Sequence, residues 1–256
     1  MIKVMYAEFD AAHRRDFVFD LPQGHEGFLL LLTQTPAVFW VDGVLTACPA
    51  NSAVLYRPHQ KIYYRASEDR YVNDWVRFLT DESYVLQSPI PCGVPFVPQD
   101  PIYLHKLFQL ITREFETSGA LKQVLLDKLL QVMFHKLAES YQGQRATLVM
   151  QNVSDLKNEI YAYPGLDWSI KLMTDKLNIS AGHLETLYRE LFGVSCMADV
   201  INSRIARAKQ YLGGSHYSIA EIVGFCGYRN AEHFYRQFKK LTGMTPKQFR
   251  ALHSPV

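Results

Sequence analysis

Basic side chains gather at one end of the sequence. Residues 200–256 hold nine Lys and Arg against two Asp and Glu, a local net charge of +7, whereas the whole chain of 256 residues carries only +2. Such a cluster of cations can bind the phosphates of a polyanion, most often a nucleic acid. The same charge could serve solubility alone, so the pattern suggests a nucleic-acid partner without fixing it.

Groups that hold metals or react covalently are sparse. The four cysteines include no Cys-x-x-Cys pair, which disfavours a disulfide framework or a thiolate zinc site and favours a reducing cytoplasm. His13, His25 and His59 are scattered, with only Glu26 beside one of them. A metal-dependent enzyme would need two or three histidines at strand spacing plus a carboxylate. We therefore expect no metal, no cofactor and no catalytic residues.

No segment predicts membrane insertion or secretion. The longest unbroken apolar run is Phe28–Leu32, far shorter than a bilayer-spanning helix. Residues 1–17 carry several charges and no long apolar stretch, so we expect no secretory signal. These features predict a cytoplasmic protein without a membrane partner.

Aromatic rings with polar tips concentrate between residues 40 and 75. Their flat apolar faces and polar edges suit a sugar or another polar ring compound. Strand alternation sends Tyr63 and Tyr64 to opposite faces, so at most one of them can face an interior. Trp40 and Trp75 could also be plain core residues. The candidate effector-binding residues are Trp40, Tyr56, Arg57, His59, Tyr64, Arg65 and Trp75.

Short strands must position these rings. Asp42-Gly43 separates two such strands and predicts a tight hairpin, because both central residues of the turn need positive φ. Many short strands without intervening helices predict a sandwich or barrel, which we place at residues 1–98. The runs rich in β-branched and aromatic residues are 28–33, 37–41, 44–47, 53–56, 62–65 and 71–78.

A helical hairpin is expected at residues 99–142, after a proline-rich stretch. Apolar residues recur at helical spacing over 102–116 and 121–141. The second pattern is apolar on more than one face, which favours burial on two sides, as a dimer would supply. We expect Leu125, Leu129 and Met133 to form the dimer contact, and the polar run 141–145 to be a linker.

The C-terminal part, residues 147–256, repeats itself. Ser169-Ile170 recurs as Ser218-Ile219 about fifty residues later. Each copy has the order of a helix-turn-helix, with Asn178 or Gly227 at a turn that needs left-handed φ. The two units span about 168–193 and 217–243 and are joined by a linking helix.

The second helix of each unit begins at a good capping residue, Ser180 or Asn230. The side chains that we expect these helices to bury are Leu184, Leu187, Tyr188 and Leu191 in the first unit, and Phe234, Phe238 and Leu241 in the second.

One long motif runs through the second unit: Ser218-Ile219-Ala220-Glu221-Ile222, Gly227-Tyr228, His233-Phe234-x-Arg236-x-Phe238-Lys239-Lys240, Gly243-Met244-Thr245-Pro246 and Phe249-Arg250. This pattern resembles the AraC/XylS family of transcription regulators, over roughly residues 150–252. The first unit departs from the family pattern at Thr174, Thr186 and Asp199. The resemblance implies an α+β two-domain protein with an N-terminal cupin-like barrel that senses a ligand, a helical dimer contact and a C-terminal all-α DNA-binding domain.

The second helix of a helix-turn-helix enters the major groove with its outward residues. Arg236 has the paired donors that suit guanine, whereas Lys239, Lys240 and Lys247 suit phosphates. Because residues 145–199 carry net −2 and 200–256 carry +7, we expect the second unit to supply most of the electrostatic affinity. The candidate DNA-binding residues are Gly182, His183, Glu185, Thr186, Arg189, Arg229, Glu232, His233, Arg236, Lys239, Lys240 and Lys247.

Three hypotheses follow for the function. The first is a regulator, an activator by preference, that binds double-stranded DNA as a homodimer, responds to a small molecule such as a sugar, and contacts RNA polymerase as a further partner. The second is a ligand-independent repressor whose barrel is only structural. The third, which the histidine spacing disfavours, is a metal-dependent cupin enzyme with a DNA-binding tail.

Overall fold

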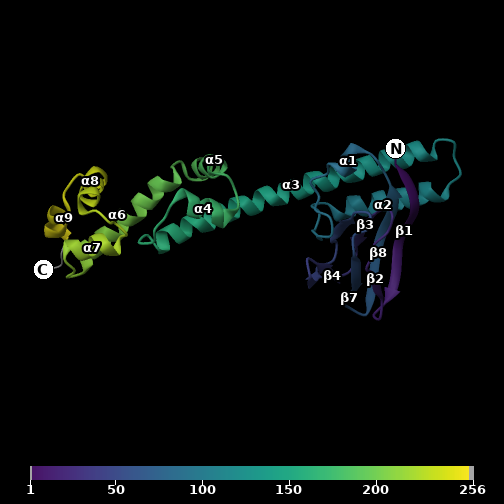
Figure 1. The fold of residues 1–256 in the computed structure, drawn as a ribbon, viewed down its shortest axis with the longest axis horizontal. Coiled ribbons are helices and arrows are strands. Elements are labelled where there is room, and N and C mark those ends of the chain that lie inside the picture. Colours follow the sequence, from purple (N-terminus) through teal and green to yellow (C-terminus); the bar gives the residue numbers. More distant parts are fainter. Residues whose placement is uncertain (1, 254–256) are drawn as a thin grey trace. The chain divides into compact units, whose positions relative to one another are not determined.

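A computed structural model describes residues 2–253 and divides into two units, Met1–Arg145 and Ala146–Val256. Figure 1 shows strands together with helices in the first unit and helices alone in the second. The α+β class and the all-α C-terminal domain that the sequence predicted are confirmed.

The strands of the first unit form two four-stranded antiparallel sheets. The sheet orders are β1-β8-β3-β6 and β2-β7-β4-β5. The strand bounds are β1 Lys3–Arg14, β2 Val18–Leu21, β3 Phe28–Thr33, β4 Ala37–Val41, β5 Val44–Cys48, β6 Ala53–Tyr56, β7 Ile62–Ala66 and β8 Arg70–Leu79. The expected hairpin at Asp42-Gly43 is confirmed, with φ of 46° and 94° at its two residues.

Both faces of β3 are buried, which explains its unbroken apolar run. Leu29 and Leu31 pack between the two sheets. Leu30 and Leu32 point the other way and pack with the helices. A strand covered on both faces needs no polar side.

Two strands were not expected from the sequence, β1 and β2. Each lies at the edge of its sheet. Edge strands keep much of their surface in water, so their side chains remain polar or charged and the apolar signal is weak. Side chains of β1 accordingly alternate between exposed and covered along most of the strand.

Helices cover one face of the first sheet. They are α1 Ser83–Leu86, α2 Pro101–Glu116 and α3 Lys122–Ala162. In Figure 1, α2 runs across the direction of the strands. Asp100 caps α2 by accepting from the backbone N–H of Tyr103. The expected linker at 141–145 is instead helical, since one glycine costs a helix only about 1 kcal/mol relative to alanine.

The second unit contains two small cores, one for each helix-turn-helix. Its helices are α4 Ile170–Leu177, α5 Ala181–Phe192, α6 Cys196–Gly214, α7 Ile219–Phe225, α8 Ala231–Thr242 and α9 Pro246–His253. The long linking helix α6 contributes Val200 to the first core and Ile205 to the second. No helix within residues 2–253 is long and apolar enough to cross a membrane.

The turn and cap residues of both units are as expected. Asn178 and Gly227 adopt positive φ, at 50° and 74°. Ser180 and Asn230 accept from backbone N–H groups in the first turns of α5 and α8. The expected burial of Leu191 and Leu241 is wrong: these equivalent leucines are 38% and 45% exposed near the ends of their helices, beyond the small cores.

Candidate nucleic-acid interface and sensor cavity

The second helix of each helix-turn-helix unit, α5 or α8, is called its reading helix below. In the second unit, α8 buries apolar side chains on one face and exposes polar and charged side chains on the other. Phe234 and Phe238 are fully buried and fix the helix on its unit. The residues on its outer side, Glu232, His233, Arg236, Lys239 and Lys240, are all exposed. Their cations would meet a duplex first if this helix enters a groove.

The cations of this face are free to bind an anion. Within residues 2–253, Arg236, Lys239, Lys240 and the exposed Lys247 form no ion pair with an acid. Arg229 differs, because its guanidinium pairs with Asp167, although both side chains are largely exposed. An exposed pair of this kind is worth little and can be exchanged for a phosphate.

A hydrogen-bonded chain orients His233 on the same face. The hydroxyl of Tyr228 donates to Oε1 of Gln237 over 2.7 Å. Nε2 of Gln237 must then be the donor to Nε2 of His233, 2.9 Å away. This leaves the proton of a neutral His233 on Nδ1, available to an acceptor. Gln237 was not predicted as a site residue, because its only signal in the sequence is its position one turn after His233.

The first reading helix, α5, offers fewer free groups. Glu185 accepts from Nε of Arg189 over 2.8 Å and from Sγ of Cys196 over 3.3 Å. The hydrogen bond from Arg189 lowers the pKa of Glu185. The hydroxyl of Thr186 donates to the carbonyl of Gly182 over 3.0 Å. His183 and Gly182 are exposed, and space around Gly182 is open.

The three residues expected at a dimer contact do not share one environment. Leu125 is 45% exposed, whereas Met133 is fully buried in the core of its own unit. Leu129 is partly buried against that core. Met133 therefore presents nothing to a second copy, and the expectation is corrected there. The exposed apolar residues near Leu125 are Val124 and Val132 on α3 and Leu121, which directly precedes that helix.

A cavity of about 200 Å³ lies between the two sheets of the first unit. Two of the expected effector residues, Tyr64 and Trp75, line it. The complete lining is Glu8, His13, Phe17, Phe19, His25, Leu29, Tyr64, Asn73, Trp75 and Arg77. Half of these residues come from the segment of β1, β2 and the loop after it, which the sequence analysis did not identify as part of a site.

The other five expected effector residues lie elsewhere. Nζ of Lys61 stacks over the ring of Trp40 at 3.9 Å, away from the cavity lining. Tyr56 is 1% exposed and packs in the core between the sheets. Arg57 and His59 are exposed in the turn after β6. Arg65 donates to the carbonyl of Ala66. Their prediction as one lining is corrected: strand register separates them.

The cavity combines aromatic walls with polar groups. Asn73 is 1% exposed, and no group among residues 2–253 donates to its Oδ1. Nη1 of Arg77 lies 3.2 Å from Nδ1 of His25. Burial, and then the charge of Arg77, lower the pKa of His25, and burial lowers the pKa of His13. A neutral molecule with hydrogen-bond donors would satisfy this surface.

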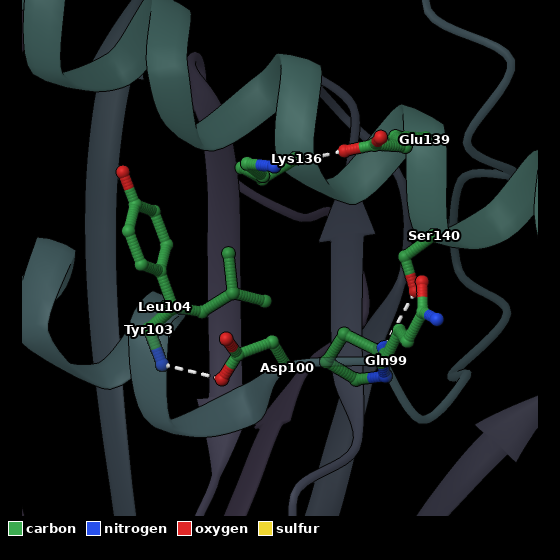
Figure 2. Close-up of a pocket in the computed structure, with 8 residues that line it drawn as sticks. Gln99, Asp100, Tyr103, Leu104, Lys136, Glu139 and Ser140 are labelled. Carbon is green, nitrogen blue, oxygen red and sulfur yellow. Dashed lines mark hydrogen bonds and ion pairs between the residues drawn. The ribbon is translucent and has the colours of Figure 1, made fainter.

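A second hollow, of about 460 Å³, lies beside the start of α2 and the middle of α3 (Figure 2). Its polar groups already bind one another. Nζ of Lys136 lies 3.0 Å from Glu139, and Ser140 accepts from the backbone N–H of Gln99 over 2.6 Å. The dashed lines in Figure 2 follow these contacts. This hollow therefore offers less to a ligand than the cavity between the sheets.

Asp10, Asp74 and His105 form a cluster of groups that are able to ligate a metal. Their ligand atoms lie within 4.8 Å of one another. The carboxylate of Asp74 accepts from Nδ1 of His105 over 2.6 Å and from the backbone of Asp10 over 2.9 Å. Nε2 of Gln34 donates to both acids. Burial raises the pKa of Asp74. Because its oxygens are already bonded, the cluster serves as a link between α2 and the first sheet.

Comparisons with known proteins agree with this arrangement. Residues 173–252 match the helix-turn-helix domain family. The arabinose operon regulatory protein of Salmonella typhimurium is 24% identical over 92% of this chain and 88% of its own length. The xylose operon regulatory protein of Escherichia coli is 27% identical over 48% of this chain and 31% of its own length.

A solved structure is also similar in part. The C-terminal domain of AraT, a response regulator from Geobacillus stearothermophilus, is 24% identical, covers 41% of this chain and 88% of its own, and superposes with a TM-score of 0.39. The family match and the relative that spans most of the chain agree with the two helix-turn-helix units. Residues 173–252 form a helix-turn-helix DNA-binding domain, and the chain is similar to transcription regulators of the AraC/XylS family.

Proposed function

We propose that the chain is a sugar-responsive transcription activator that binds double-stranded DNA as a homodimer in the cytoplasm, with RNA polymerase as a further partner. The observation that carries the DNA part is the outer face of α8, where Arg236, Lys239 and Lys240 are exposed and without acidic partners within residues 2–253. Arg236 would contact bases, and the lysines would contact phosphates.

The two reading helices would contribute unequally. On α5, Glu185 and Arg189 neutralise each other, so this helix adds little net attraction for phosphates. His183, Thr186 and Gly182 would approach the bases there, and His233, Glu232 and Arg229 would complete the contacts of the second unit. The second unit would then set affinity, and the first would add sequence preference.

A sugar is the effector that the cavity favours. Trp75, Phe17 and Phe19 provide apolar walls for the faces of a ring. The unpaired Oδ1 of Asn73 and the carboxylate of Glu8 would accept from hydroxyl groups. The volume of about 200 Å³ fits one small ring. Two relatives named for arabinose and xylose operons support this class.

The functional boundaries that we propose are a sensor at 1–98, a dimerisation segment at 99–142 and a DNA-binding domain at 147–256. Leu125 and its exposed neighbours on α3 are the apolar surface best placed for a second copy. Leu129, partly buried at its edge, would widen that contact.

The proposal is tested by measuring DNA binding with and without pentoses and hexoses. Bound sites are first selected from random DNA, and affinity is then measured by gel shift while each sugar is titrated. One sugar should change the affinity or the footprint and raise the melting temperature of the protein. DNA binding that no sugar alters would retain the regulator and reject the sugar. Failure to select any DNA site would reject the whole proposal.

A further inference from the structure

The two helix-turn-helix units differ at one pair of equivalent core positions. Tyr188 of α5 corresponds to Phe238 of α8, and both are fully buried. One aromatic partner of Phe238 is Phe249 on α9, with ring centroids 5.6 Å apart. At the position that corresponds to Phe249, as Ser195 corresponds to Thr245, the first unit has Asp199. An apolar contact in one unit is therefore replaced by a polar one in the other.

Asp199 is the centre of a buried hydrogen-bond network. It is 3% exposed, and its Oδ2 accepts from the hydroxyl of Tyr188 over 3.0 Å. The hydroxyl of Tyr161 donates to Oδ1 over 3.0 Å. Nζ of Lys157 lies 3.3 Å from Oδ2 and balances the charge. The network thus joins the end of α3 to α5 and to the first turn of α6.

The network is confined to the first unit. The buried residues Val153, Leu156 and Ile160 of α3 correspond to Ile205, Ala208 and Leu212 of α6, so Lys157 and Tyr161 correspond to Lys209 and Gly213. Gly213 has no side chain, Lys209 is exposed, and Phe249 has no group that accepts a hydrogen bond. The second unit thus relies on packing alone at this place.

Directional bonds constrain a helix more than apolar packing does. An aromatic contact tolerates sliding and rotation, whereas a carboxylate with donors on two other helices accepts only a narrow range of arrangements. Breaking one donor would also leave a buried charge poorly compensated. The acid at the first turn of α6 is further favoured by the helix dipole.

We propose that Asp199 is a positioning residue for DNA recognition: it fixes the orientation of α5 on the end of α3, so that DNA contacts of the first unit depend on it and those of the second do not. This rests on the proposed DNA contact by α5. Asp199 itself touches no DNA, because it lies in the core of the unit.

The experiment compares Asp199→Asn and Tyr188→Phe with the wild-type chain on a selected operator. Hydroxyl-radical footprints are recorded together with affinities for operators in which either half-site is scrambled. Both variants should lose protection of the first-unit half-site and at least tenfold in affinity for the intact operator. With that half-site scrambled, their affinities should equal that of the wild type. The matched control is Ser203→Ala, a buried polar residue on the same helix that should leave both footprints unchanged.

A double variant separates positioning from stability. Tyr188→Phe with Asp199→Phe installs the apolar pair of the second unit, so it should melt within a few degrees of the wild type. The first-unit footprint should nevertheless remain lost. Restoration of that footprint by the double variant, or equal loss at both half-sites in the single variants, would overturn the proposal.

Hydrogen exchange tests the same idea without DNA. In Asp199→Asn, backbone amides of α5 should exchange at least tenfold faster, while those of α8 stay unchanged. Unchanged exchange in α5 contradicts the positioning role. If the wild type protects only the second half-site while exchange in α5 responds as expected, positioning stands and DNA contact by α5 is rejected.

Discussion

Nη1 of Arg77 lies 3.2 Å from Nδ1 of His25 at the lining of the sensor cavity. Arginine can only donate, so Nδ1 accepts and the proton of the neutral imidazole is on Nε2. A second proton on His25 would have to displace this contact and face the guanidinium charge. The cavity is thus built for a neutral histidine.

Acidification should therefore destabilise the sensor unit. The pKa values of His25 and His13 lie below 6.5 in the folded protein. The unfolded chain consequently binds more protons as the pH falls below 6.5, and stability is lost until the folded pKa values are reached. Well above pH 6.5 both states are unprotonated at these histidines, so they no longer change the stability. The melting temperature should decline from pH 7 to pH 5.5, and less steeply in His25→Gln; equal slopes would contradict this origin.

Trp75 and Asn73 should control effector affinity. Trp75→Ala removes an aromatic wall of the cavity, and Asn73→Val removes the unpaired buried acceptor. A hydrogen bond to a buried group is worth about 1–3 kcal/mol, which corresponds to roughly a 5- to 150-fold loss in affinity. Calorimetry with the active sugar measures this. The control, Trp40→Ala, changes an aromatic residue outside the cavity and should bind normally; an equal loss there would place the ligand elsewhere.

The sequence predicted what local rules determine. Asp42-Gly43 specifies its hairpin through its own φ angles, and Asn178 and Ser180 specify a turn and a cap within a few residues. The repeat then revealed both helix-turn-helix units, because each carries its own small core.

The cavity could not be predicted in the same way. Glu8 and His13 reach it only because β1 pairs with β8, and β1 bears the weak alternation of an edge strand. Tyr56 and Tyr64 looked equivalent in sequence and both pack in the core between the sheets, yet only Tyr64 also reaches the cavity. Met133 was wrongly expected at a dimer contact for a similar reason. When a helix has apolar residues on every face, its sequence pattern does not show which face packs against the core of its own unit.

Salt dependence should separate the two reading helices. Arg236→Ala with Lys240→Ala removes a base contact and a phosphate contact made by two unpaired cations, so operator affinity should fall strongly and the slope of log K against log salt should flatten by about 0.9, the share of Lys240. Thr186→Ala with Arg189→Ala removes one cation that already pairs with Glu185, and should leave that slope nearly unchanged. Gel shifts at several salt concentrations provide the comparison. The reverse order would contradict the greater role of the second unit.

Association of two copies should depend on the exposed apolar residues at the start of α3 and directly before it. Leu121 and Leu125 are 64% and 45% exposed, so Leu121→Lys with Leu125→Lys should leave the fold intact and shift the protein to a monomer. Sedimentation velocity over a range of concentrations measures the shift, with circular dichroism as the check on folding. Lys128→Leu, on the same side, should instead strengthen association. A dimer that survives the double change would move the contact to another surface.

Gly227 should be far more sensitive to substitution than Gly243, although the two have nearly the same φ, 74° and 78°. An alanine at Gly243 meets open space, so it should cost only the left-handed conformation, about 1–2 kcal/mol. At Gly227 the added Cβ would lie 2.7 Å from the carbonyl oxygen of Gly165, a backbone atom that cannot turn aside. Gly227→Ala should therefore melt at a clearly lower temperature than Gly243→Ala in the same buffer. Equal melting temperatures would mean that the turn after α3, which contains Gly165, can shift to accommodate the added Cβ without loss of stability.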